Sequence, residues 1–163
     1  MMVIVKEIAP AQYPLLENFL YNAIFLPPGA DSLPREVIFQ PEIFIYIDGF
    51  GDNPGDCGVI AEADGKVIGA AWTRIIPAYG HIDDDTPELA ISVLPDCRNQ
   101  GVGIALMTRL FELLQDMGYN RTSLSVQKIN PAVRFYERLG YEIMGGESGR
   151  AKNEDYIMIK ELA

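Results

Sequence analysis

The chain has few of the residues that build metal and redox sites. Its 163 residues include two cysteines and one histidine. Cys57 and Cys97 are too few for a zinc site by themselves, and they lie too far apart in the sequence for the chemistry of a Cys-x-x-Cys pair. Free thiols of this kind are typical of the cytoplasm, where disulfides are rare. We therefore expect no metal centre and a cytoplasmic location.

Long apolar runs and positive charge are also scarce. No stretch approaches the ~20 apolar residues that cross a membrane, and Lys6 and Glu7 interrupt the apolar start too early for a secretory signal. There are 13 Lys and Arg against 23 Asp and Glu, which gives a net charge of −10. Affinity for a phosphate backbone depends on Lys and Arg. We expect neither nucleic acid nor a membrane as a partner.

The chain is rich instead in apolar residues and in alternating strand and helix patterns. With 163 residues, 48% of them hydrophobic, it suits one domain with a well-filled core, spanning 1–163. The patterns predict an α/β fold with a mixed sheet and helices on both faces. The predicted strands are 3–8, 59–63, 66–75, 88–93, 122–126, 141–144 and 156–159, and the predicted helices are 10–24, 34–47 with a break at Pro41, 102–117 and 131–139.

The most informative segment covers residues 93–103 and reads Val-Leu-Pro-Asp-Cys-Arg-Asn-Gln-Gly-Val-Gly. It predicts a strand, a short turn and a helix opened by Gly101 and Gly103. The first turn of a helix carries N–H groups without intrahelical partners, together with the positive end of the helix dipole. Glycines let a ligand approach that backbone closely. The loop 98–103 therefore suits a phosphorylated small molecule, although a glycine can also open a helix for packing alone.

The sequence does not match two other phosphate-binding motifs. A Walker loop contains Gly-Lys-Ser or Gly-Lys-Thr, and the sequence has neither. A dinucleotide fingerprint has a small residue three positions after Gly103, where Leu106 stands. It also has an acidic residue at the end of the next strand, where Gln127 and Lys128 follow. The sequence therefore predicts neither a P-loop nor a dinucleotide site.

The turn Arg-Asn-Gln-Gly-Val-Gly at 98–103 resembles the Arg/Gln-x-x-Gly-x-Gly/Ala signature of the GNAT (GCN5-related N-acetyltransferase) family. The segment 89–95 resembles the family's fourth strand, which ends in Val-x-Pro-Asp. Downstream, the segment 130–141 reads Asn-Pro-Ala-Val-Arg-Phe-Tyr-Glu-Arg-Leu-Gly-Tyr and resembles the family's segment from Asn through Ala and Tyr to Gly-Phe. Tyr141 replaces the more usual Phe. The resemblance covers about residues 87–145.

This resemblance implies a GNAT-like fold, in which a mostly antiparallel sheet is splayed at the acetyl-CoA site. It implies direct transfer of an acetyl group from acetyl-CoA to an amine of a small molecule or a peptide. A non-catalytic acyl-CoA sensor or scaffold with the same fold is the alternative. A homodimer is among the assemblies that the resemblance allows. The identity of the acceptor depends on residues 25–55 and 76–87, where no motif matches.

The resemblance also implies where acetyl-CoA binds. N–H groups of the turn and of the helix start would bind the pyrophosphate, with a charged contact from Arg98. The pantetheine arm would pair with the strand edge at 91–93 as an added strand, at a bulge, with N–H groups near the thioester carbonyl. Asn130 would cap its helix and contact the arm. The predicted binding residues are Ile91, Ser92, Val93, Arg98, Asn99, Gln100, Gly101, Val102, Gly103, Ile104 and Asn130.

Catalysis by direct transfer needs a base and an acid. Tyr136 matches the family's tyrosine near the CoA sulfur, where a neutral phenol can donate to the leaving thiolate; otherwise it is a core tyrosine. An alkylamine is mostly protonated near neutrality, and Glu88 is the candidate base that removes its proton. His81, with an ordinary pKa near 6.5, and bulk water are the alternatives. We interpret the aspartates at 83–85 as a solvated charge run, and we count Trp72 as a candidate wall of the acceptor pocket.

Overall fold

In the computed structural model, the described part of the chain forms one sheet of seven strands in the order β1-β2-β3-β4-β5-β7-β6. The structure describes residues 2–144 and 154–162. Neighbouring strands run antiparallel, except that β4 and β5 are parallel. The strands are β1 (Ile4–Glu7), β2 (Cys57–Ala63), β3 (Lys66–Arg74), β4 (Glu88–Val93), β5 (Arg121–Gln127), β6 (Glu142–Ile143) and β7 (Asp155–Glu161).

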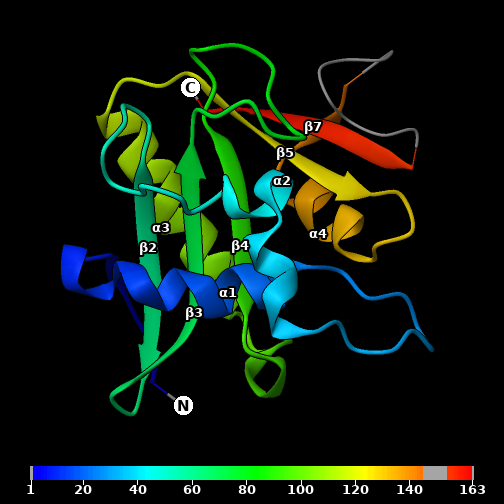
Figure 1. Cartoon of the computed structure of the whole chain (residues 1–163). Coiled ribbons are helices and arrows are strands. Elements are labelled where there is room, and N and C mark those ends of the chain that lie inside the picture. Colours follow the sequence, from blue (N-terminus) through cyan, green and yellow to red (C-terminus); the bar gives the residue numbers. More distant parts are fainter. Residues whose placement is uncertain (1, 145–153, 163) are drawn as a thin grey trace.

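Helices cover both faces of the sheet (Figure 1). In this view α1 crosses in front of the central strands with α2 beside it, and α3 lies behind them. The residues of α4 pack in the same apolar cluster as those of α3. The predicted mixed sheet with helices on both faces is confirmed. The helices are α1 (Leu16–Ala23), α2 (Pro41–Phe44), α3 (Val102–Asp116) and α4 (Ala132–Arg138).

Two of the predicted helical stretches contain only short α-helices. The stretch 10–24 begins as a 3₁₀ helix, Pro10–Leu15, and becomes α-helical only at Leu16. Pro14 lies inside that 3₁₀ segment, and proline has no N–H to donate to a helical bond. The stretch 34–47 is divided at Pro41, as predicted, because a 3₁₀ helix at Arg35–Phe39 ends before Pro41 starts α2.

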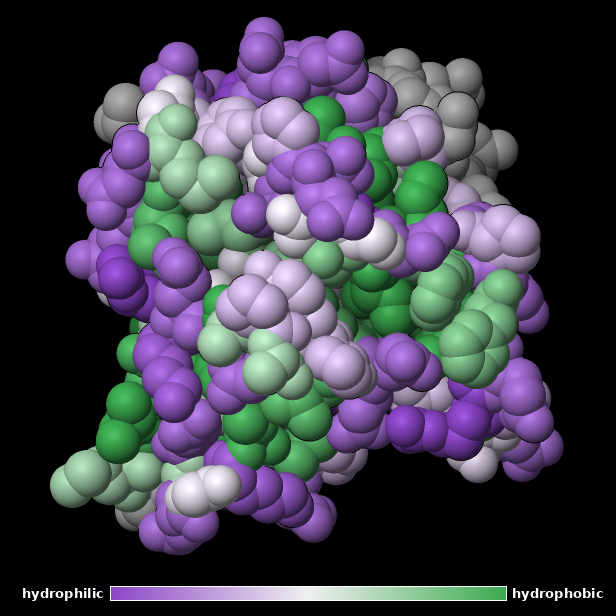
Figure 2. Space-filling model, turned by 60° about the vertical axis from the view of Figure 1, so that its left-hand side comes forward, coloured by the Kyte–Doolittle hydropathy of each residue, from purple (hydrophilic) through white to green (hydrophobic). Residues whose placement is uncertain are grey.

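The sheet separates two apolar layers. On one side Leu106, Leu110 and Leu114 of α3 are fully buried against the sheet. On the other side Leu16 of α1 packs with Trp72 of β3. Both layers pack against the central strands, and this packing holds β3 and β4 firmly in place. The surface is mixed: in Figure 2 hydrophilic residues crowd the upper part of the face shown, and apolar residues reach it in patches between them.

The parallel strands β4 and β5 meet at one register pair only, Glu88 with Ser123. Beyond this pair the two strands diverge, as Figure 1 shows. The sheet is thus splayed, as the resemblance implied. The predicted bulge at 91–93 is wrong, since β4 pairs with β3 in continuous register from Glu88 to Val93. The register shift lies instead in the pairing of β2 with β3, where Ala61 pairs with Gly69 and Glu62 with Val67, so that β3 carries the extra residue. The gap arises because β5 turns away.

Candidate active site

The edge of β4 that faces the gap offers backbone groups at alternate residues. The N–H of Leu94 donates to the carbonyl of Ile68 on β3 at 2.8 Å, and β4 keeps the same register with β3 throughout. In an antiparallel ladder every second residue bonds the same neighbour. The backbone groups of Ile91 and Val93 therefore face away from β3, into the gap. Two of the predicted binding residues thus line the edge that an extended ligand could pair with.

Ser92 does not face this gap. Its backbone falls on the alternate residues that bond β3, opposite Ala70. Its buried hydroxyl donates to the carbonyl of Phe19 on α1 at 2.6 Å. The predicted contact of Ser92 with the donor is therefore corrected, because strand alternation turns this residue toward β3 and α1, where it fixes the helix to the sheet.

The glycine turn lies at the open end of the gap. Asn99 and Gly101 both have positive φ, +61° and +82°, a conformation that glycine adopts without steric cost. A Cβ on Gly101 would meet nothing within 4 Å, so the space beside it is open. The first helical bond of α3 runs from the N–H of Ala105 to the carbonyl of Gly101. The preceding N–H groups, at 102–104, therefore have no partner within the helix.

Gly103 has a packing role that the sequence did not reveal. A Cβ at this position would lie 3.1 Å from the ring of Phe135 on α4. The missing side chain thus lets α4 approach the start of α3. We expected Gly103 to leave space for a ligand, and its open neighbour Gly101 fits that description better.

Arg98 and Asn130 both bond the backbone beside the gap. The Nε of Arg98 donates to the carbonyl of Val93 at 2.9 Å, and its Nη2 lies 3.4 Å from the carbonyl of Asn22. Arg98 therefore braces the end of β4, although its side chain is exposed and could reach a phosphate. The Oδ1 of Asn130 accepts from the N–H of Ala132 at 2.9 Å. Asn130 was expected to be the N-cap, but Pro131 holds that position and α4 starts at Ala132. The contact leaves the side-chain amide of Asn130 to donate elsewhere.

Tyr136 lies on α4 in an aromatic cluster. Its ring packs against Phe135 and Tyr141, with ring centres 5.5 and 5.8 Å away. Burial raises the pKa of Tyr136 to about 12, so the phenol is neutral at pH 7. Among the described residues its hydroxyl makes no hydrogen bond, and it is therefore free to donate to a bound group.

Glu88 is a buried carboxyl at the closed end of the gap. Its residue is 2% exposed. Its Oε2 accepts from the N–H of Gly80 at 3.0 Å and from the hydroxyl of Tyr46, whereas its Oε1 is buried without a partner among the described residues. Burial raises the pKa of Glu88 to about 7, against the lowering effect of these two hydrogen bonds. A carboxyl that titrates near neutrality is suited to proton transfer.

His81, the alternative base, lies on the loop between β3 and β4. Its side chain is 27% exposed, and its Nε2 lies 3.7 Å from the carboxylate of Asp84. Its Nδ1 is buried with no partner among the described residues. Neither of the two hydrogen bonds of Glu88 described above involves His81, so the two residues remain separate candidates for the base.

The loop that carries His81 is tied firmly to β5. The hydroxyl of Ser123 donates to the carbonyl of Gly80 at 2.8 Å. Arg121 contacts both Thr86 and Asp83. We interpreted 83–85 as a solvated charge run, and this is wrong for Asp83, whose carboxylate is paired with Arg121. Its two acidic neighbours are exposed.

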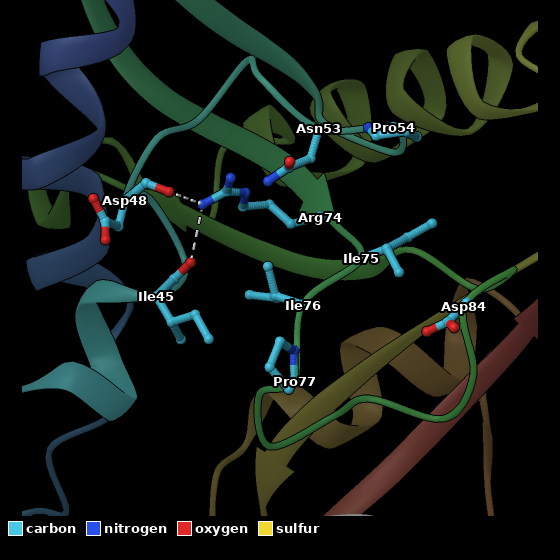
Figure 3. A pocket seen from close by; sticks show the side chains of 9 residues that line it. All are labelled: Ile45, Asp48, Asn53, Pro54, Arg74, Ile75, Ile76, Pro77 and Asp84. Carbon is cyan, nitrogen blue, oxygen red and sulfur yellow. Dashed lines mark hydrogen bonds between the residues drawn. The ribbon is translucent and has the colours of Figure 1, made fainter.

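A pocket of about 480 Å³ lies at the end of β3, between the segment that follows α2 and the loop before β4. Arg74 points into the middle of this region and bonds the carbonyls of Ile45 and Asp48 (Figure 3). Arg74 is also the register partner of Glu88, although Glu88 itself is not among the lining residues. The lining residues are Ile45, Asp48, Asn53, Pro54, Arg74, Ile75, Ile76, Pro77 and Asp84.

The charge of Arg74 is already compensated inside the protein. The residue is 1% exposed, and its Nε and Nη2 bond the two carboxylate oxygens of Asp56 at 2.9 and 3.2 Å. The same carboxylate accepts from the N–H of Gly51. This buried pair fixes the loop before β2. It also leaves the carboxylates of Asp48 and Asp84 on the pocket lining without a contact to Arg74.

Sequence reasoning missed the most important neighbours of Glu88. Tyr46 stands in an apolar run and carried no signal of its own. Arg74 did, because a charged residue in a buried strand needs a partner. Trp72, which we counted as a pocket wall, is 1% exposed in the core and donates its Nε1 hydrogen to the carbonyl of Tyr46.

The part of the chain that the structure describes holds no group of three or more His, Cys, Asp or Glu residues arranged to bind a metal ion. Its helices include none that is long and apolar enough to cross a membrane.

The fold matches solved structures of acetyltransferases. The ribosomal-protein-S18-alanine N-acetyltransferase of Escherichia coli superposes with a TM-score of 0.67 at 20% identity, covering 99% of this chain and 95% of that one. The PaiA N-acetyltransferase of Thermoplasma acidophilum, solved with coenzyme A, gives 0.70 at 17% identity and covers 99% of each chain. The architecture is thus that of an acetyltransferase fold.

Sequence comparison identifies the family. Residues 20–141 match the acetyltransferase (GNAT) family. An uncharacterized N-acetyltransferase of Methanocaldococcus jannaschii is 31% identical over 115 residues, which cover 69% of this chain and 70% of that protein. The chain therefore belongs to the GNAT family, and the family and fold predicted from its sequence are confirmed. A mycothiol acetyltransferase of Pseudarthrobacter chlorophenolicus is 31% identical over 90 residues, and the match spans only 28% of that protein.

Proposed function

We propose that this domain transfers an acetyl group from acetyl-CoA directly to the nitrogen of an amine. The observation that carries the proposal is the gap between β4 and β5, which opens from the pair Glu88 and Ser123. One end of the gap holds a buried carboxyl with a pKa of about 7. The other end holds the glycine turn and the unpaired N–H groups of α3.

The donor fits this gap in an extended form. The backbone edge at Ile91 and Val93 would pair with the amides of the pantetheine arm, and the amide of Asn130 would add a contact from the other side. N–H groups of the turn and of the first turn of α3, at 99–104, would bind the pyrophosphate. Arg98 would add its positive charge there.

Glu88 is the base of the proposed reaction. Its unpaired Oε1 would take one proton from the ammonium form of the acceptor, since an alkylamine is mostly protonated at neutral pH. The freed nitrogen then attacks the thioester carbonyl carbon. N–H groups on the edge of β4 would stabilise the negative charge that forms on the carbonyl oxygen.

Tyr136 is the acid. As the carbon–sulfur bond breaks, its phenol would donate a proton to the sulfur and regain one from the newly acylated nitrogen. The products are the N-acetyl amide and the thiol of CoA, and the proton on Glu88 returns to water. Burial supports this role because it keeps the phenol protonated at working pH.

The acceptor is proposed to enter through the pocket beside Arg74. This pocket starts at the register partner of Glu88, and the carboxylates of Asp48 and Asp84 lie on its lining. With Arg74 paired to Asp56, the lining favours a cationic amine, free or on a peptide. Pairing with a second copy of the chain and a cytoplasmic location remain predictions from the sequence.

The test is a screen of amines with acetyl-CoA, in which release of the CoA thiol is measured. Thermal unfolding with and without acetyl-CoA is recorded in parallel. We expect thiol release with at least one cationic amine, and a stabilisation of about 2.7 kcal/mol at a hundredfold excess over the dissociation constant. Stabilisation without any acetylated amine would favour the acyl-CoA sensor. No stabilisation at millimolar acetyl-CoA would refute the proposed function altogether.

A further inference from the structure

Tyr46 contacts the carboxyl of Glu88 through its side chain, from a segment far away in the sequence. The two residues are 42 positions apart, and the Tyr46 hydroxyl donates to Oε2. We propose that Tyr46 is a positioning residue, whose hydroxyl fixes the carboxylate of Glu88 so that Oε1 is left free to take the proton of the acceptor amine. This inference rests on the proposed function and adds a residue that neither the family motifs nor the sequence pattern indicated.

The same strand holds both partners in place. Trp72 on β3 donates its Nε1 hydrogen to the carbonyl of Tyr46 at 2.9 Å, and Arg74 donates to the neighbouring carbonyl of Ile45 at 3.0 Å. Arg74 is also the register partner of Glu88. Because one rigid strand positions the tyrosine and the carboxyl together, their contact is preorganised rather than left to a mobile loop.

These contacts give the two carboxylate oxygens of Glu88 different roles. Oε2 is held from two sides, by the Tyr46 hydroxyl and the N–H of Gly80. Oε1 is equally buried and has no partner among the described residues. Gly80 must be glycine here, since a Cβ would lie 2.9 Å from the carboxyl carbon. A transferred proton would therefore reside on Oε1.

Tyr46 remains a donor throughout the working pH range. Burial, followed by the nearby charge of Glu88, raises the pKa of Tyr46 well above its ordinary value. A hydrogen bond to the charged form of an acid lowers its pKa, and this bond has that effect on Glu88. Loss of the Tyr46 hydroxyl should therefore raise the pKa of Glu88 further.

Few other charged groups face this pair. On β3 Arg74 is neutralised by Asp56. The loop before β4 brings Tyr79, whose backbone hydrogen bond to Tyr46 lowers the pKa of that phenol, and His81, whose Nε2 is directed to Asp84. On β5 the register partner Ser123 is uncharged. The Tyr46 hydroxyl is thus the side-chain contact whose removal should be felt directly at Glu88.

The experiment follows the protonation of Glu88 directly. The side-chain carboxyl carbon is titrated by carbon-13 NMR in the wild type and in Tyr46→Phe, with Glu88→Gln to assign the signal. A hydrogen bond to a charged group is worth about 1.5–3 kcal/mol, so we expect the midpoint to rise by about 1–2 pH units. Tyr21→Phe is the control, because it also loses a hydroxyl that donates, to the carbonyl of Leu33, and it should leave the midpoint unchanged.

The rate profile gives the second readout. With an acceptor in hand, the ascending limb of kcat/KM should move upward in pH by the same amount in Tyr46→Phe, which lowers the rate at pH 7 by roughly 5- to 50-fold. An unchanged carboxyl midpoint would overturn the inference, whatever the rate does. A shifted midpoint in a protein that acetylates no amine would instead remove the proposed function and retain the contact.

Poor folding of Tyr46→Phe would not end the test, because the wild type offers its own measurement. The phenol carbon that bears the hydroxyl of Tyr46 should show a titration step at the midpoint of Glu88, and this step should vanish in Glu88→Gln. The absence of that step in the wild type would equally overturn the inference.

Discussion

The buried carboxyl of Glu88 should make the protein less stable as the pH rises through neutrality. In the unfolded chain this group has its ordinary pKa of 4.5, whereas the folded state raises it to about 7. The folded protein therefore holds the proton more tightly. The stabilisation is complete below pH 4.5 and is lost progressively as the pH rises through 7.

The size of the effect follows from the same values. A difference of about 2.5 units corresponds to about 3 kcal/mol in the free energy of unfolding. Because Glu88 is 2% exposed, solvent screening does little to reduce this figure. Glu88→Gln keeps the shape of the side chain and an oxygen that can accept from Tyr46, but it carries no charge. The variant should match the wild type near pH 4.5 and exceed its stability by up to about 3 kcal/mol at pH 8.5.

The assay is thermal or urea unfolding of both proteins at several values between pH 4.5 and 8.5. For a chain of this size the gain corresponds to about 6–12 °C in Tm at the alkaline end. Glu161→Gln is the matched control, because this glutamate is exposed on β7, and its difference from the wild type should be flat with pH. Titrations shared by both proteins cancel in the comparison. A constant difference for Glu88→Gln across the range would refute the argument that burial tunes this carboxyl for proton transfer.

Two further predictions concern α4 and the start of α3. Tyr136→Phe should lower turnover by about 10²-fold, the low end of the range for general-acid catalysis. Calorimetry should show little change in the affinity for acetyl-CoA, because the donated hydrogen bond matters most in the transition state. Full turnover in this variant would show that Tyr136 is only a core residue. Gly103→Val should lower Tm and weaken acetyl-CoA binding, since a side chain there meets the ring of Phe135. Gly103→Val with Phe135→Ala should recover part of both, whereas no recovery would show that the glycine serves the ligand directly.

The parts of this site that depend on local geometry could be predicted from the sequence. The strand 88–93 has the predicted bounds. Asn130 accepts from the N–H of Ala132 as a capping side chain would, although α4 begins one residue later than predicted, with Pro131 in the N-cap position. The positive φ of Gly101 follows from the turn in which it stands. Capping, turns and strand alternation involve residues that are a few positions apart, so the local sequence is enough to predict them.

Which groups surround Glu88 was decided only by the tertiary structure. Tyr46 contacts the carboxyl of Glu88 from 42 positions away in the sequence. The burial that raises the pKa of Glu88 comes from the packing of several elements. The gap itself exists because β5 diverges from β4 after Ser123, and the hydrophobic pattern of the two strands does not predict this divergence. Likewise, the ring of Phe135 beside Gly103 reflects how α4 meets α3. Burial and long-range hydrogen bonds depend on which distant segments meet, so the sequence by itself identified a candidate base, and the fold supplied its surroundings.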